Sequence, residues 1–298
     1  MAEGINYLLV VWHAATLSML LGGPFLVVRQ IFSLKLKGSG LGAHLAGVVS
    51  ALPQPFCSCF AAPVGATLYS KGASLGPMLA FTVSSPMLNI TTLILAAALL
   101  PIEFAVLRTG GGIIVGVFIT YGVSLIAARW VSEDRPEAGE SKLVDWNSKV
   151  LGAYSRLFHF EKLFSEAIIE SPAALISNWL GMTWRLTRVV VHLLVIFSVI
   201  AVYIVQVMPD SGNNITGVAV TAIFATLLMI PTWTEVPLAA GLINNGLTGI
   251  AAVMLITLPA VSIPGLLITA GAVRSLKVAL ILGLSVLIAG ILAGIIFL

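Results

Sequence analysis

Long apolar runs, bounded or broken by proline and glycine, are the feature that most limits what this chain can fold into. From Val278 to Leu298 the chain carries no charged residue, and similar runs recur along most of its length. A helix needs about 20 apolar residues to cross the hydrocarbon core of a bilayer. A membrane β-barrel would show short segments of alternating polarity instead. The runs therefore predict an all-α polytopic membrane protein.

Composition supports the same class. Of the 298 residues, 59% are hydrophobic and 9% are charged, whereas about 25% of the residues in soluble domains are charged. The net charge of +3 comes from basic residues beside apolar runs, where they orient helices, so no nucleic-acid partner is expected. The N-terminus has no basic segment typical of a signal peptide, so we expect the first run to remain as a membrane helix.

Three kinds of apolar segment alternate along the chain. Some are predicted to cross the membrane directly: 5–31, 110–130, 189–208 and 278–298. Two are long enough to cross but are interrupted, 74–100 at Ser84-Ser85-Pro86 and 249–272 at Leu258-Pro259. The rest are arms too short to cross, namely 41–52, 60–70, 216–230 and 238–242.

The two halves of the chain share this order of segments. Gly72 aligns with Gly246, an offset of 246 − 72 = 174, and Pro86 aligns with Pro259 at an offset of 259 − 86 = 173. We therefore predict a first membrane repeat over 1–131 and a second over 184–298. The polar segment 132–183 between them is predicted to be a cytoplasmic linker with an amphipathic helix at the membrane surface.

The distribution of basic residues predicts the orientation of the repeats. Suppose that the short arms form re-entrant hairpins and that the N-terminus lies outside. Every lysine and arginine except Arg108 then falls on the cytoplasmic side, as the positive-inside rule prefers. This arrangement makes the repeats opposite in direction. Two inverted-topology repeats, each with a re-entrant helical hairpin and a broken transmembrane helix, are typical of secondary transporters.

Irregular backbone persists inside a membrane only where protein buries it or where it lines a wet cavity. We therefore expect the breaks to form one central site. Cys57-Ser58-Cys59 lies in the first hairpin, and two thiols one residue apart can converge on a soft, thiophilic centre. Buried packing is the competing interpretation, because cysteine is small and apolar, and a Cys57–Cys59 disulfide is a further one.

Glu235 is the only acidic residue that this arrangement places deep in the membrane. An intramembrane carboxyl group is a functional candidate by default. Burial favours its neutral form, so Glu235 is the candidate proton-coupling residue; the alternative is a structural hydrogen bond to a carbonyl. Other polar or aromatic residues at the breaks are candidates to bind solute or, equally, to join helices: Ser58, Ser84, Ser85, Asn89, Trp233, Thr257 and Ser262.

Residues 47–100 also resemble a known family. The matching residues are Pro55-Phe56-Cys57-Ser58-Cys59, Pro63, Lys71-Gly72-Ala73-Ser74, Gly76, Ala80-Phe81, Ser84-Ser85-Pro86 and Asn89. They resemble the signature of the predicted permease family that includes the organoarsenical efflux permease ArsP. The resemblance is looser over 230–272. It implies export of a small compound, with trivalent organoarsenicals as the known substrate class, and it carries the Cys-Ser-Cys motif onto Cys57 and Cys59.

These observations predict a secondary active transporter that moves a small solute across a bacterial or archaeal plasma (inner) membrane. A trivalent organoarsenical is the candidate thiophilic solute. Two other classes remain open. One is a channel, because inverted hairpins also build pores, and the other is a membrane thiol oxidoreductase that uses Cys57 and Cys59.

No P-loop and no haem-binding Cys-x-x-Cys-His occurs in the sequence. We therefore expect no enzymatic activity, no cofactor and no metal site. The expected partners are the solute and membrane lipid, and a homo-oligomer is compatible with the sequence.

Overall fold

The computed structural model describes residues 36–54, 58–70, 72–129, 131, 180–181, 184, 212–227 and 235–298. Every regular element within these ranges is a helix. Four helical stretches are long and apolar enough to cross a membrane: Leu75–Leu99, Ile102–Ala127, Thr248–Val273 and Leu276–Ile296. The all-α membrane class is therefore confirmed. The predicted spans 5–31 and 189–208, and nearly all of the linker 132–183, lie outside the described residues.

Two of these stretches consist of two helices joined at a break. Their helices are α4 (Leu75–Met87) with α5 (Ile90–Leu99), and α13 (Thr248–Ala260) with α14 (Ile263–Val273). Pro86 and Pro259 each stand one residue before the end of the first helix in the pair. A proline lacks the N–H that the helix ladder needs, so the helices end where the prolines predict an interruption. Asn89 and Ser262 then cap the second helices.

The other two long stretches are continuous. One comprises α6 (Ile102–Ile113), the π-helix η2 (Ile114–Ile119) and α7 (Thr120–Ala127), and the other is α15 (Leu276–Ile296). The first begins earlier than the predicted Gly110, directly after Pro101, because proline favours the start of a helix. The boundary prediction was wrong, and Arg108 consequently lies inside the helix.

Four shorter helices complete the described part. They are α2 (Leu41–Ala51), α3 (Ser58–Ser70), α11 (Ile215–Leu227) and α12 (Glu235–Asn244). Each has between 10 and 13 residues, which is too short to cross the hydrocarbon core.

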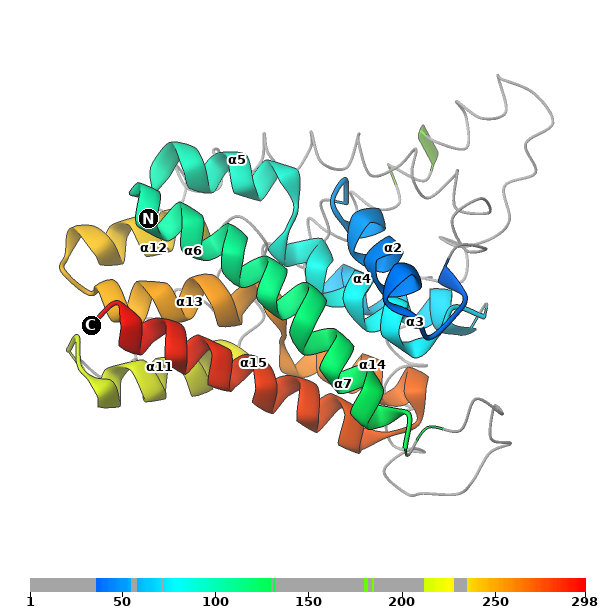
Figure 1. Cartoon of the computed structure of the whole chain (residues 1–298). Coiled ribbons are helices and arrows are strands. Elements are labelled where there is room, and N and C mark those ends of the chain that lie inside the picture. Colours follow the sequence, from blue (N-terminus) through cyan, green and yellow to red (C-terminus); the bar gives the residue numbers. More distant parts are fainter. Residues whose placement is uncertain are drawn as a thin grey trace.

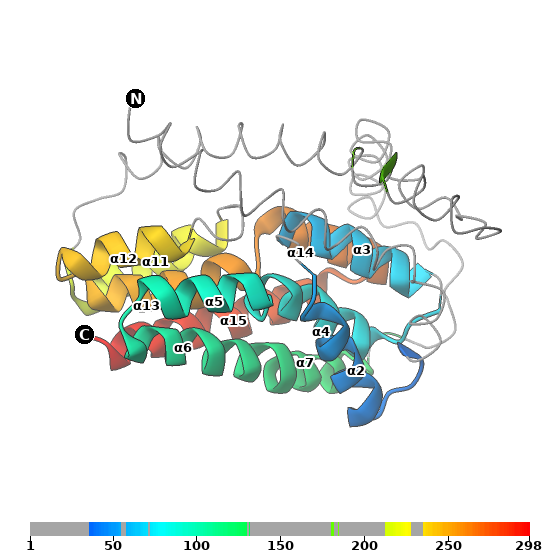
Figure 2. The same ribbon diagram turned by 90° about the horizontal axis from the view of Figure 1, so that it is seen from above.

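The broken stretches form the interior and the continuous ones lie outside them. α4 and α13 are buried along nearly their whole length. In Figure 1, α4–α5 and α13–α14 run in opposite directions, and so do α6–α7 and α15. Figure 2 shows α3 beside α14 at one end and α12 beside α5 at the other. The outer face of α15 exposes an apolar stripe of the kind that contacts lipid: Leu280, Leu284, Ile288 and Leu292.

Small residues let α15 approach α13 closely. A Cβ atom on Gly290 would collide with the Cγ2 atom of Thr257, and one on Gly294 would lie 2.7 Å from a methyl group of Val218 in α11. Glycines four residues apart are a common device for close helix contact in membranes. They bring α15 against both α13 and α11.

We expect Gly290→Ala to lower the free energy of unfolding by about 1–3 kcal/mol, because the added methyl group overpacks the contact with Thr257. Gly122→Ala in α7 is the matched control, since a Cβ there meets no atom within 4 Å. Thermal unfolding in detergent measures both. Equal midpoints for the two variants would contradict the packing described here.

Candidate solute site at the helix breaks

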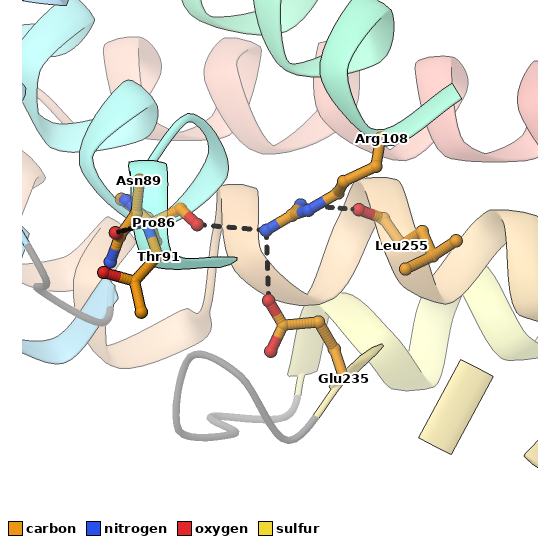
Figure 3. A network of polar contacts seen from close by, with 6 residues as sticks. All are labelled: Pro86, Asn89, Thr91, Arg108, Glu235 and Leu255. Carbon is orange, nitrogen blue, oxygen red and sulfur yellow. Dashed lines mark hydrogen bonds and ion pairs between the residues drawn. The ribbon is translucent and has the colours of Figure 1, made fainter. Parts of the chain in front are cut away.

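Arg108 connects the two breaks through its guanidinium group. The side chain extends from α6 and is 0% exposed. Its Nη1 donates to the carbonyl oxygen of Leu255 at 2.7 Å, and its Nη2 donates to that of Pro86 at 3.0 Å. Nη2 also donates to Oε1 of Glu235 at 3.0 Å (Figure 3). One side chain therefore bonds to both broken stretches and to α12.

The helix breaks explain why these two carbonyl groups need a donor. Leu255 lies four residues before Pro259, so its carbonyl oxygen faces a residue without an N–H. Pro86 would accept from the N–H of Ile90 in a continuous helix, but that N–H donates to the carbonyl of Leu52 at 3.3 Å instead. A buried carbonyl without a partner is unfavourable. The guanidinium group supplies the missing donors.

The ion pair between Arg108 and Glu235 is buried. Their side chains are 0% and 2% exposed. Glu235 is the first residue of α12, where the helix dipole favours a negative charge. Separating two charges in a medium of low dielectric constant is costly. The pair therefore fixes the start of α12 against α6.

Six of the predicted solute-binding residues are described in full, and all six are buried: Ser58, Ser84, Ser85, Asn89, Thr257 and Ser262. Ser58 at the start of α3 and Ser262 at the start of α14 come together, with their Oγ atoms 3.3 Å apart. Thr257 instead bonds to the carbonyl oxygen of Val253 in its own helix at 2.8 Å. Its hydroxyl group is thus engaged within α13.

Several buried polar atoms around the first break have no hydrogen-bond partner within the described part of the chain. They are Oγ of Ser84 and Ser85, Nδ2 of Asn89, Oγ1 of Thr92, and both amide atoms of Gln54. The bond from Ile90 N–H to the Leu52 carbonyl brings the segment of Gln54 against the start of α5. Each unsatisfied group costs about 1–3 kcal/mol. These polar groups are concentrated around the break between α4 and α5.

Three predicted site residues cannot be placed in this arrangement. Cys57 and Trp233 lie outside the described residues, and so does the side chain of Cys59, whose backbone belongs to α3. The predicted proximity of Cys57 to Glu235 therefore stays a prediction. Glu235 itself is buried and pairs with Arg108.

Sequence reasoning missed Arg108 and Gln54 as site residues. The signal for Arg108 was present, because it is the one basic residue that the predicted orientation does not place in the cytoplasm. An intramembrane arginine explains that exception. Gln54 gave only the signal of a polar residue between Pro53 and Pro55.

The sequence model of the predicted permease family ArsP_1 matches residues 27–298. The chain belongs to this predicted permease family. Among curated proteins, this permease is similar to UPF0718 protein YraQ of Escherichia coli K12, with 28% identity over 97% of this chain and 78% of the relative. It is also similar to UPF0718 protein MJ0584 of Methanocaldococcus jannaschii, with 27% identity over 93% of this chain and 90% of the relative. No solved structure matches significantly.

We expect Arg108→Met to lower the free energy of unfolding by about 3–5 kcal/mol, because it leaves the Glu235 carboxylate buried without its counter-charge. The double variant Arg108→Met, Glu235→Leu should recover part of this loss but not all, since the carbonyl groups of Pro86 and Leu255 still lack a donor. Thermal unfolding in detergent measures both variants. A double variant no more stable than the single one would contradict the ion pair.

Proposed function

We propose that this permease is a secondary active transporter that moves a small solute by alternating access around the helix breaks. The observation that carries the proposal is the buried Arg108 guanidinium group, which bonds to both broken stretches and to Glu235. Solute sites in secondary transporters are typically formed by broken helices whose freed backbone groups are satisfied by polar groups in the interior. Belonging to a predicted permease family supports the same reading.

The recurrence of helix boundaries supports two repeats. Helix starts recur at 248 − 75 = 173, 263 − 90 = 173 and 276 − 102 = 174. The capping residues Asn89 and Ser262 are also 262 − 89 = 173 residues apart. Gly72 and Gly246, at the predicted offset of 174, both have a positive φ angle. We assign the repeats to 1–131 and 184–298, with 132–183 as the linker.

The direction of the chain supports inversion. Corresponding stretches run in opposite directions, α4–α5 against α13–α14 (Figure 1). The pairs α2–α3 and α11–α12 correspond to the short arms, and in both figures they lie at opposite ends of the molecule. We propose that each pair is a re-entrant hairpin, entering from opposite sides of the plasma (inner) membrane.

We place the solute at the unsatisfied polar atoms of the first break and at the start of α3. Ser84, Ser85, Asn89 and Gln54 supply hydrogen-bonding groups, and the contact of Ser58 with Ser262 adds the second repeat. Cys57 and Cys59 would add thiols beside Ser58, and Trp233 would add a wall from the second repeat. A trivalent organoarsenical, exported from the cell, is the proposed solute because the resemblance to ArsP and the thiol chemistry agree.

Ser85→Ala tests this site, because the Ser85 hydroxyl group has no hydrogen-bond partner among the described residues. Its removal should leave the free energy of unfolding unchanged or slightly higher but weaken solute binding. A panel of solutes, including trivalent methyl- and phenylarsenicals, would be compared by thermal stabilisation of purified protein. Thr269→Val is the matched control, since Thr269 is outside the candidate site and its hydroxyl group bonds within α14. Equal stabilisation of Ser85→Ala and the wild type would remove Ser85 from the site.

Glu235 is the proposed proton-coupling residue. A proton on its carboxyl group would abolish the charge that pairs with Arg108, and Arg108 also holds the carbonyl groups of Pro86 and Leu255. Proton and guanidinium group thus compete for one carboxylate. Release of Arg108 would loosen both breaks together, which is the event that alternating access needs.

A pH gradient should change solute flux into proteoliposomes of the wild-type protein, and Glu235→Gln should abolish that effect because glutamine cannot exchange a proton. Glu235→Asp should retain it, and Glu103→Gln, an exposed carboxyl group on α6, is the control. A pH effect that survives in Glu235→Gln would refute coupling at this residue. Single-channel currents, or a solute flux that does not saturate with solute concentration, would favour the channel. Redox-dependent reactivity of the Cys57 and Cys59 thiols without solute flux would favour the oxidoreductase.

A further inference from the structure

A buried histidine lies in the described part of the chain away from the Arg108–Glu235 pair. His44 belongs to α2 and is 1% exposed. α2 packs against α4 and η2, and in Figures 1 and 2 it lies at the opposite end of the molecule from α12. The ring nitrogen Nε2 lies 3.1 Å from the carbonyl oxygen of Val117 and 3.0 Å from Oγ1 of Thr120.

The neighbours of Nε2 determine the tautomer of the ring. The Thr120 hydroxyl group donates its only hydrogen to the carbonyl oxygen of Gly116 at 2.6 Å. It can therefore only accept from His44, and the Val117 carbonyl group also only accepts. Nε2 must carry a hydrogen atom, which makes Nδ1 the basic nitrogen. Nδ1 is buried and has no hydrogen-bond partner among the described residues.

The contacts of Nε2 all lie at the π-helical part of the outer helix. Val117 and Gly116 belong to η2, and Thr120 follows it directly. A π-helical turn inside an α-helix leaves backbone carbonyl groups out of register and is frequent at functional sites. The His44 ring and the Thr120 hydroxyl group bond to two carbonyl groups of this section, those of Val117 and Gly116. The ring of His44 thus ties α2 to the irregular section of the outer helix.

Among the described residues, the helices around Nδ1 provide no group that could neutralise a positive charge. A Cβ atom on Gly76 would lie 3.2 Å from Nδ1 and 3.3 Å from Oγ of Ser124, and the Ser124 hydroxyl group donates to the carbonyl oxygen of Tyr121. The sequences of α4 and η2 contain no titratable residue, and that of α7 contains only Tyr121. The Tyr121 ring packs edge-on against His44 at 5.2 Å.

We propose that Nδ1 of His44 is a second proton-binding site, whose protonation releases α2 from η2 during the transport cycle. A charged imidazolium group enclosed by apolar groups is costly. A proton on Nδ1 therefore favours a conformation in which water or the polar surface of the protein reaches the ring. This inference rests on the proposed transport function. The proton here and the one proposed at Glu235 bind to groups on different repeats.

Nitrogen NMR of ¹⁵N-histidine-labelled protein in lipid nanodiscs tests the proton site directly. The chain has four histidines, and the loss of signals in His44→Gln assigns the ring. If that variant does not fold, replacing His13, His159 and His192 by glutamine assigns it instead. We expect the Nε2–H tautomer at alkaline pH and a doubly protonated ring at acid pH. An Nδ1–H tautomer, or a ring that does not titrate while the protein stays folded, would overturn the proposal.

Flux in proteoliposomes separates this inference from the proposed function. Measured with the same pH on both sides of the membrane, His44→Gln should still carry solute but should lose part of the change in rate that acidification causes in the wild type. His159→Gln is the control. An unchanged pH profile in His44→Gln overturns the role in transport. If no solute is transported at all, the proposed function fails, while the NMR titration still decides whether Nδ1 binds a proton.

Discussion

A carbonyl group freed at a helix break inside a bilayer needs a donor from the protein, and the rest of this structure depends on how that need is met. Here the donor is the guanidinium group of Arg108. Its planar fork of N–H groups can reach several acceptors at once. One side chain therefore donates to a carbonyl group in each of the two broken stretches. Its charge in turn requires a counter-charge, which Glu235 supplies from the start of α12. The interior is polar at this point because the helices are broken there.

This arrangement couples parts of the chain that are far apart in sequence. The residues that bond to Arg108 come from α4, α12 and α13. A displacement of any one of these helices would therefore alter the hydrogen bonds that Arg108 makes to the other two. A buried ion pair adds little net stability compared with apolar packing, but breaking it is costly. The buried ion pair therefore suits a protein that alternates between two distinct arrangements of its helices. Around the first break, the hydroxyl group of Ser85 and the amide group of Gln54 have no hydrogen-bond partner within the described ranges.

Local chemistry made the helix breaks predictable, whereas the partners across them were not. Pro86 and Pro259 predict where α4 and α13 end because each removes an N–H from its own helix, which is a property of the residue itself. The start of α6 was misplaced, and Arg108 lies inside the helix instead of before it. An arginine is tolerated inside a span only when a carboxylate and free carbonyl groups surround it, and none of its acceptors is near it in sequence. His44 gave no signal either, since a single histidine in an apolar helix has no characteristic spacing.

The sequence by itself determined that the chain is a bundle of membrane helices with two proline breaks, because hydrophobic length and the missing N–H of proline act locally. Only the tertiary structure decided that Arg108 lies between the breaks, that Glu235 is its partner, and that Ser58 meets Ser262. Those contacts join residues more than a hundred positions apart. They exist because the folded helices bring donors and acceptors together that have no partner within their own helices.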